Sequence, residues 1–290
     1  MKNRTSLTTE YMALFRAIES TRPTDSRLFC DPFAALFLHR WRKWLYEIAQ
    51  YDAGRRLVER LLDRETPGAR AAGIARTKWI DDEVNLALKT CMQLVLLGAG
   101  FDTRAYRLKA AQRINTFELD RPGTSVLKQA VLRKEIGSLP KQVKFVNINF
   151  NTQSVIDVLS RAGFDEMQRT CVVWEGVTNY LSPEAVDGIF RQIAQAAGGS
   201  VLLFTYVDRK VLDEPELFFG AEKLLSRLRS YEETWTFGFY PDEIERYLAE
   251  RKLRLLQDIG VAEVWQHECR PGSEIHGYEF YRLASACVQR

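Results

Sequence analysis

Two glycines and an aspartate are the first residues in this sequence whose types and spacing could bind a cofactor. Gly98 and Gly100 follow the apolar run that begins at Leu94, and Asp120 ends the next apolar segment, twenty residues after Gly100. Glycine at both positions permits a tight turn that a ligand can approach closely. A carboxylate at the end of the neighbouring strand can accept hydrogen bonds from both hydroxyls of a ribose. The spacing therefore indicates a cofactor that contains a nucleoside.

The residue five positions after Gly98 separates two classes of nucleoside cofactor. A dinucleotide site has the pattern GxGxxG, whose third glycine allows close packing of helix on strand around a pyrophosphate. Thr103 occupies that position here, and the neighbouring carboxylate of Asp102 would repel a diphosphate, although it could equally cap the following helix. S-adenosylmethionine has no diphosphate and bears a cationic sulfonium. The turn therefore favours S-adenosylmethionine over NAD, the cofactor of the alternative Rossmann oxidoreductase.

The elements that must position these residues alternate between strands and helices, which is typical of a parallel sheet covered by helices on both faces. The last two predicted strands are separated by a segment too short for a crossover helix, so they should pair antiparallel. We therefore expect an α/β fold with a doubly wound, mostly parallel seven-stranded sheet, an antiparallel last strand and a helical cap. The predicted strands are Leu94–Gly98, Ile114–Asp120, Val143–Asn149, Cys171–Glu175, Ser200–Tyr206, Leu253–Ile259 and Tyr278–Ala286.

The 290 residues are enough for one elaborated α/β domain, and we expect four units within it. Residues 1–75 are predicted to form an N-terminal helical cap, with a helix from Thr77 to Thr90 opening the core. Residues 76–206 form the cofactor-binding α/β core, residues 207–240 a helical and aromatic cap insertion, and residues 241–290 a C-terminal helix with the last two strands.

Composition narrows the class of protein further. The net charge of +3 comes from 41 basic and 38 acidic residues spread along the chain, so we expect no nucleic-acid partner. No apolar run approaches the ~20 residues of a membrane helix, and the N-terminus has no signal-peptide core. The five cysteines are scattered without CxxC spacing and form no ligand cluster with the histidines, which predicts a reducing cytoplasm and no metal site. No pattern indicates the oligomeric state.

Four motifs occur in order along the chain and together resemble a known family. They begin at Arg76 (RTKWID), Leu97 (LGAGFDTRAYRL), Phe117 (FELDRP) and Trp174 (WEGVTNYL). This order resembles the leucine carboxyl methyltransferase family, and within it the bacterial branch similar to polyketide carboxyl O-methyltransferases. The resemblance covers roughly residues 10–205 and extends to the segment from 235 to 240. It implies an S-adenosylmethionine-dependent O-methyltransferase.

The resemblance also implies how individual residues bind the cofactor. Arg76 matches the arginine that pairs with the methionyl carboxylate, a geometry that a guanidinium suits. Gly98 matches the glycine that lies against the cofactor, and Asp120 matches the ribose-binding aspartate. Glu175 matches the glutamate on the methionyl side, and Arg16 matches a basic residue of the cap that reaches the same carboxylate.

The segment after the third strand departs from the family pattern. The family usually has Asp-Leu there, and the aspartate accepts a hydrogen bond from the adenine amino group. This chain has Asn149 and Phe150. The asparagine carbonyl can still accept that bond, and the phenyl ring can cover the adenine face.

The acceptor is expected to be a small molecule, such as a natural product, with Tyr180 and Trp235 on the wall of its pocket. A carboxylate acceptor is already ionised near neutral pH and needs no general base, whereas a hydroxyl does. The candidate bases for a hydroxyl are His39, His267 and His276, although their isolation in the sequence favours a structural role for each. A protein C-terminal carboxyl methyltransferase remains the main alternative.

Overall fold

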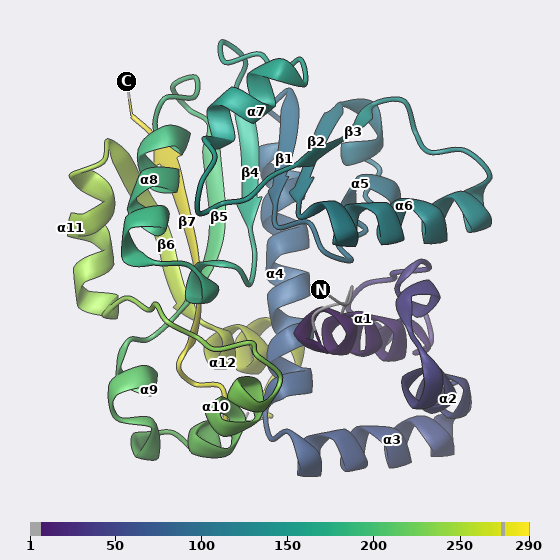
Figure 1. Ribbon diagram of the computed structural model, residues 1–290. Helices are drawn as coiled ribbons and strands as arrows, with labels where there is room; N and C mark the ends of the chain where they lie inside the picture. Colours follow the sequence, from purple (N-terminus) through teal and green to yellow (C-terminus); the bar gives the residue numbers. More distant parts are fainter. Residues whose placement is uncertain (1–6, 274–275, 290) are drawn as a thin grey trace.

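A seven-stranded sheet runs through the structure, a computed structural model that describes residues 7–273 and 276–289 (Figure 1). The strand order is β3-β2-β1-β4-β5-β7-β6, and β7 runs antiparallel to both β5 and β6 while the other pairs are parallel. The predicted fold class, including the antiparallel last strand, is therefore confirmed. The strands are β1 (Gln93–Leu97), β2 (Asn115–Asp120), β3 (Val143–Asn147), β4 (Thr170–Trp174), β5 (Val201–Val207), β6 (Leu253–Gly260) and β7 (Tyr281–Val288).

The helices cover both faces of the sheet and extend beyond one of its ends, where the cap lies (Figure 1). Four of them form the N-terminal part of the chain, and α9 and α10 belong to the segment after β5. The helices are α1 (Leu7–Ser20), α2 (Arg40–Ala49), α3 (Asp52–Glu65), α4 (Ala69–Ala87), α5 (Arg104–Arg107), α6 (Pro122–Ile136), α7 (Val155–Arg161), α8 (Pro183–Ile193), α9 (Lys210–Asp213), α10 (Ala221–Ser230), α11 (Ile244–Ala249) and α12 (Val261–Val264).

Two hydrophobic clusters hold these layers together, one on each face of the sheet. In β1, Leu94 and Leu96 join the cluster formed with α4, α6 and α12, whereas Val95 and Leu97 join the cluster formed with α7, α8 and α11. Alternate side chains of a strand point to opposite faces, so a strand buried on both sides is apolar throughout. This double burial explains the continuous apolar run that precedes Gly98.

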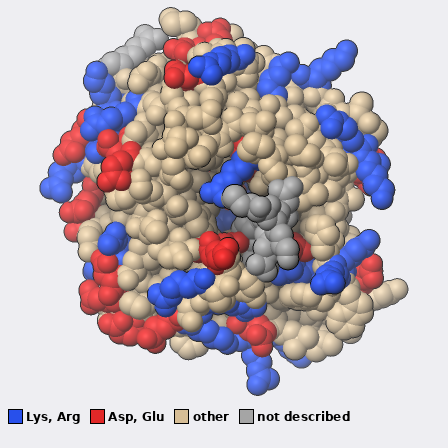
Figure 2. All heavy atoms as spheres, viewed as in Figure 1, with Lys and Arg blue, Asp and Glu red and all other residues tan. Residues whose placement is uncertain are grey.

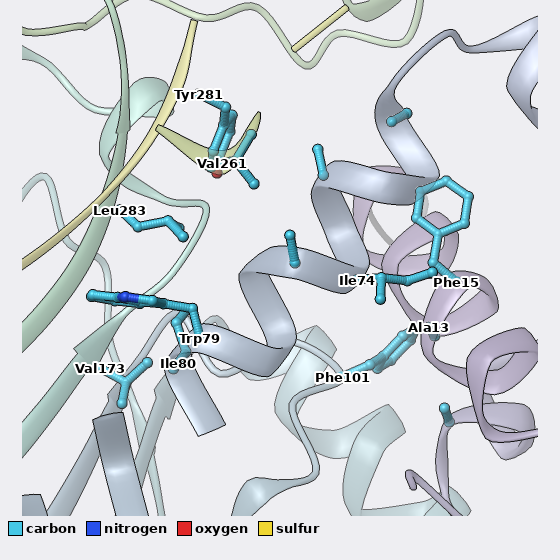
Figure 3. Packing of buried hydrophobic residues seen from close by; sticks show 14 of the residues in the cluster. Ala13, Phe15, Ile74, Trp79, Ile80, Phe101, Val173, Val261, Tyr281 and Leu283 are labelled. Carbon is cyan, nitrogen blue, oxygen red and sulfur yellow. The ribbon is translucent and has the colours of Figure 1, made fainter. Parts of the chain in front are cut away.

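Helix α4 connects the cap to the sheet and begins earlier than the sequence predicted. It starts at Ala69 rather than Thr77, so it crosses the boundary expected between residues 75 and 76. Small residues in its first turns let α1 approach closely: a Cβ atom added at Gly73 would lie 2.9 Å from Phe15 Cδ2. Figure 3 shows α1 on one side of α4 and Tyr281 on the other. One helix thus orders both the cap and the sheet end.

The segment between β6 and β7 differs from the sequence prediction, because it contains helical turns. It contains α12 and a further helical turn from Trp265 to Cys269, whereas the sequence suggested a plain short connection. Val261 and Val264 bury their side chains in the cluster that also contains α4. The two strands still pair antiparallel, because a helical turn of this length folds back without crossing the sheet.

The aromatic run after α10 belongs partly to the core and only partly to the cap. Phe239 donates its backbone N–H to the carbonyl of Val207 (3.1 Å), which returns the chain to the end of β5. Phe237 and Phe239 lie in the cluster of the second face, against Phe190 of α8. Trp235 instead packs on Phe280, with ring centroids 6.1 Å apart.

Three searches of the described residues gave negative results. None of the helices is both long enough and apolar enough to cross a membrane. No group of three or more histidine, cysteine, aspartate or glutamate side chains there could hold a metal ion. All five cysteines, which lie in the described part of the chain, are free thiols.

Candidate cofactor site

The glycine turn predicted from the sequence lies at the carboxyl end of β1, between β2 and β4. Gly98 and Gly100 have φ values of 68° and 44°, a region that L side chains rarely adopt. A Cβ atom at Gly98 would also lie 2.3 Å from Cγ2 of Val177. The turn is a topological switch point, because the strands on either side of β1 are connected in opposite directions. Such points are where open α/β sheets bind ligands.

Asp120 is fixed to this turn by backbone hydrogen bonds. Its Oδ2 accepts from the N–H of Gly100 (2.5 Å), and its Oδ1 accepts from the N–H of Arg121 (2.6 Å). Burial raises the pKa of Asp120, and the two N–H donors oppose that rise. A carboxylate has about four acceptor sites, so each oxygen can also accept from one ribose hydroxyl.

Arg76 and Glu175 meet at the same edge, from the middle of α4 and the end of β4. Arg76 Nε donates to Glu175 Oε1 (2.6 Å), and Arg76 Nη1 donates to the hydroxyl of Tyr281 (2.8 Å). Both side chains keep some accessible surface, 11% for Arg76 and 15% for Glu175. A guanidinium beside a carboxylate matches the carboxylate and ammonium of an amino-acid end.

A second arginine, which sequence reasoning did not single out, holds the other oxygen of Glu175. Arg104 Nη1 donates to Glu175 Oε2 (2.6 Å) and to Asp102 Oδ2 (2.6 Å), while its Nε donates to Asp81 Oδ1 (2.8 Å). Burial would raise the pKa of Glu175, but Arg104 and Arg76 hold it below its ordinary value. Arg104 lies within the second motif, yet no spacing rule could show that it faces three acids.

Asp102 makes two hydrogen bonds within the protein, both with Arg104. Its Oδ1 accepts from the backbone N–H of Arg104 (2.7 Å), which is a capping contact at the start of α5. Burial would raise the pKa of Asp102, but Arg104 above all holds it below its usual range. Asp102 thus satisfies the first backbone N–H of α5 from the position before Thr103, the N-cap residue.

Thr103, at the position of the third glycine, ties the turn to the cap. Its hydroxyl donates to Asp31 Oδ2 (2.7 Å), and the same oxygen accepts from Arg16 Nε (2.8 Å). Asp31 is 2% exposed, and although burial would raise its pKa, Arg16 and Arg107 hold it below its ordinary value. Glycine could not make this bond, so the departure from GxGxxG has a structural function.

Arg16 contacts the segment that carries the glycine turn. Besides pairing with Asp31, it donates from Nη2 to the carbonyl of Phe101 (2.6 Å). The structure thus places Arg16 as a support of the glycine turn. Its contact with the methionyl carboxylate, which the family resemblance implied, stays a prediction.

Asn149 and Phe150 follow β3 at the same edge of the sheet. Asn149 is exposed, and its Oδ1 accepts from the backbone N–H of Asn151 (3.1 Å). Phe150 is half-buried against the second-face cluster. An amide carbonyl has two lone pairs, so Asn149 can still accept a bond from an adenine amino group, as predicted.

Tyr180 and Trp235 lie together on the opposite side of the site from Asp120. Tyr180 ends a 3₁₀ turn after β4, and the backbone N–H of Thr236 donates to the carbonyl of Asn179 in that turn (2.8 Å). Burial raises the pKa of Tyr180 to about 12, with Thr8 and Trp235 facing its hydroxyl. Tyr281 also lies near Tyr180. The role of Tyr180 and Trp235 in an acceptor pocket stays a prediction.

The three histidines lie on the surface. His39 precedes α2 with its side chain 56% exposed and its Nδ1 3.6 Å from Glu10 Oε1. His267 is exposed in the helical turn before Cys269, and His276 is exposed shortly before β7. Among the described residues, the hydrogen bonds of Arg76, Glu175 and Asp120 involve none of them.

The outer surface carries charges of both signs. Figure 2 shows Lys, Arg, Asp and Glu side chains interspersed around the rim of one face, with a mostly uncharged area between them. Arg42, one of the clustered basic residues of α2, is itself paired with Glu10 (3.0 Å). The expectation that the protein binds no nucleic acid stays a prediction.

Comparison with known proteins agrees with this site. The sheet order and the edge that carries the glycine turn define a Rossmann-like methyltransferase fold. Residues 9–194 match the family model of leucine carboxyl methyltransferase, so the chain belongs to that family. S-adenosylmethionine is accordingly its cofactor, and the turn, the carboxylate of Asp120 and the Arg76–Glu175 pair are groups that fit it.

Curated relatives are named as candidate S-adenosyl-L-methionine-dependent methyltransferases. One from Frankia alni is 34% identical over 218 residues, which are 73% of this chain and 74% of the relative. One from Streptomyces coelicolor is 31% identical over 206 residues, covering 70% and 69%. One from Mycolicibacterium smegmatis is 31% identical over 177 residues, covering 59% and 55%. The chain thus spans about half to three quarters of the length of these relatives.

Solved structures share the fold at low sequence identity. A candidate methyltransferase from Thermobifida fusca has a TM-score of 0.58 and 20% identity, covering 94% of this chain and 97% of its own. A DUF574 family protein from Streptomyces avermitilis has a TM-score of 0.58 and 13% identity, covering 94% and 100%. These likenesses establish the fold alone.

Proposed function

We propose that this protein is an S-adenosylmethionine-dependent O-methyltransferase that methylates a small molecule, with a carboxylate as the favoured acceptor and a hydroxyl as the second choice. The observation that carries the proposal is the Arg76–Glu175 pair beside Asp120 and the glycine turn. Together these groups match both ends of the cofactor, the amino-acid end and the ribose. The family match does not favour the NAD-type oxidoreductase alternative.

The residues of this chain would bind and orient the cofactor rather than react with it. Arg76 pairs with the methionyl carboxylate, Glu175 with the ammonium, and Asp120 with the ribose hydroxyls. When bound, the cofactor supplies an electrophilic methyl group on its sulfonium. Because methyl transfer is an in-line displacement, alignment and exclusion of water supply most of the acceleration.

The acid–base chemistry of the acceptor side supports a carboxylate acceptor. A hydroxyl acceptor needs a base, and His39, His267 and His276 are all exposed. Tyr180, whose pKa is raised to about 12, stays protonated at neutral pH and can only donate to or accept a hydrogen bond. A carboxylate acceptor is ionised without help.

The experiment that tests this function supplies isotopically labelled methyl donor with a whole-cell extract that contains both small metabolites and proteins. We expect the label in a compound that releases labelled methanol in mild alkali, since methyl esters hydrolyse there and methyl ethers do not. Arg76→Met serves as the cofactor-binding control and should give no product. Alkali-stable label would contradict a carboxylate acceptor, and label in the protein fraction would support the protein C-terminal carboxyl alternative.

The proposal includes a cellular setting and a division of the chain. We place the reaction in the cytoplasm, in natural-product metabolism, with the acceptor enclosed by residues 1–75 and 207–240. The core at 76–206 and the C-terminal part at 241–290 would hold the cofactor. The free cysteines support this setting, since disulfides are rare in a reducing compartment.

A further inference from the structure

Arg104 is the most heavily used side chain at the methionyl end of the site. It is 2% exposed, and its guanidinium donates to Glu175, Asp102 and Asp81. Asp81 is in turn held by both Nη atoms of Arg107. Glu175 therefore cannot rotate without breaking a bond to a guanidinium that two other bonds, to Asp102 and Asp81, keep in place.

Tyr281 holds Arg76 in place by a hydrogen bond, as Arg104 holds Glu175. Its hydroxyl accepts from Arg76 Nη1 (2.8 Å) and lies 3.1 Å from Thr205 Oγ1, which also accepts the backbone N–H of Gly176 (2.8 Å). The guanidinium carbon of Arg76 lies 5.2 Å from the centroid of the Tyr281 ring, within the range of a cation–π contact. The first residue of β7 thus links Arg76 to the backbone that follows Glu175.

We propose that Arg104 and Tyr281 are positioning residues that hold Glu175 and Arg76 as a rigid pair of opposite charges, which makes the site selective for a nucleoside thioether that carries both an ammonium and a carboxylate. The proposal rests on the proposed function, because it assigns that pair to the amino-acid end of the cofactor. Neither residue needs to touch the cofactor. Preorganised charges bind more strongly than mobile ones, since less order is lost on binding.

Because of the charges around Glu175, loss of Arg104 and loss of the Tyr281 hydroxyl should have different effects. Glu175 faces Arg76 from α4, Arg104 from α5 and the carboxylate of Asp102 from the turn, while Asp81 and Tyr281 lie behind the two arginines. Loss of Arg104 would leave burial and Asp102 to raise the pKa of Glu175. Loss of the Tyr281 hydroxyl would free Arg76 and leave the charges unchanged.

The test is calorimetric titration with two probes, S-adenosylhomocysteine and 5′-methylthioadenosine. They share the adenosine and the thioether, and only the first has an amino-acid end. We expect Arg104→Met to weaken S-adenosylhomocysteine about thirtyfold, since hydrogen bonds to charged groups contribute ~1.5–3 kcal/mol. Tyr281→Phe should weaken it about fivefold, since Arg76 keeps its bond to Glu175. Binding of 5′-methylthioadenosine should change less than about twofold in both variants.

Two matched control variants change residues that directly follow Tyr281 in β7 and Thr205 in β5. Arg282→Met removes an arginine that pairs with Asp258, and Tyr206→Phe removes a buried hydroxyl bonded to the same carboxylate. Both should leave both affinities unchanged. In Arg104→Met the affinity for S-adenosylhomocysteine should also fall more steeply with decreasing pH than in the wild type, because Arg104 no longer opposes protonation of Glu175.

The outcomes separate the two proposals. If the wild type binds neither probe, the proposed function fails. If it binds S-adenosylhomocysteine but the variants lose both probes equally, or lose neither, the positioning role is overturned. Should Arg104→Met not fold, Arg104→Lys, which keeps the charge and loses the forked geometry, and Tyr281→Phe decide the question by the same comparison of probes.

Discussion

The methionyl end of the site and its acceptor side are built from different kinds of residue. Around Arg76 and Glu175 the side chains are charged, and each is held by bonds of 2.6–2.8 Å. Around Tyr180 and Trp235 they are aromatic and held mainly by packing, with centroids 6.1 Å apart for Trp235 and Phe280. The two regions lie next to each other, because Tyr281 bonds to Arg76 and also lies near Tyr180.

This difference indicates which of the two regions tolerates amino-acid substitutions. Removing one partner of a buried ion pair leaves an unpaired charge and costs ~3–5 kcal/mol, whereas aromatic packing tolerates replacement by groups of similar volume at lower cost. The charged end therefore requires particular residues at particular distances. The aromatic side can change with the acceptor while the cofactor end stays the same.

The largest expected effect comes from breaking the charged end. Arg76→Met should weaken S-adenosylhomocysteine by about 100-fold, because it removes the partner of the methionyl carboxylate and leaves Glu175 with Arg104 alone. Calorimetry measures this change. The control is Arg191→Met, which removes an arginine on α8 whose side chain is 59% exposed. A fall of less than threefold would mean that Arg76 does not bind the cofactor.

Next in size is the stability of the ion pair beneath the turn. The folded protein lowers the pKa of Asp31, so its stabilising contribution is present above the ordinary aspartate pKa and is lost as the pH falls through the lower folded value. Asp31→Asn should cost ~3 kcal/mol in the free energy of unfolding at pH 7, and the cost should shrink toward pH 3.

Urea denaturation at both pH values checks this result. Asp213→Asn serves as the control, because Asp213 forms an exposed pair with Arg209 that should contribute little. An equal cost of Asp31→Asn at pH 7 and pH 3 would show that charge pairing is not what Asp31 contributes.

A smaller effect is expected from the aromatic side. Trp235→Phe should leave S-adenosylhomocysteine binding within about twofold and raise the acceptor KM several-fold, since the ring lines the acceptor side only. Trp44→Phe on the exposed face of α2 is the matched control. Equal losses in cofactor and acceptor binding would erase the distinction between the two regions.

The smallest effect is expected from the histidines. Replacing His39, His267 and His276 together by glutamine should leave the turnover number within about twofold at saturating cofactor, because a carboxylate acceptor needs no base. A large fall in turnover that depends on pH near 6.5 would instead indicate histidine-assisted methylation of a hydroxyl.

The cofactor end could be predicted from the sequence, because a residue that directly follows a parallel strand lies at the carboxyl edge of the sheet. Gly98, Asp120 and Glu175 follow three neighbouring parallel strands, and the carboxyl ends of such strands meet. Arg76 came from the family resemblance, since nothing in its spacing shows which face of α4 it uses.

Other features depend on tertiary contacts that no local pattern encodes. Tyr281 is 106 residues beyond Glu175 and faces Arg76 only because β7 pairs with β5 in a register that sets Tyr281 opposite Val207. Arg104 turns inward because three acids from separate segments meet it. The aromatic run at Phe237 and Phe239 enters the core rather than the cap, and sequence periodicity does not distinguish these two environments.

The central claim is that the charged edge of this sheet binds a methyl donor through its amino-acid end. Titration of the wild-type protein with S-adenosylhomocysteine, 5′-methylthioadenosine and NADH tests it directly. The account predicts one S-adenosylhomocysteine per chain, bound at least about tenfold more tightly than 5′-methylthioadenosine, and no heat from NADH. NADH binding as tight as that of S-adenosylhomocysteine, or equal affinity for the two thioethers, would contradict it.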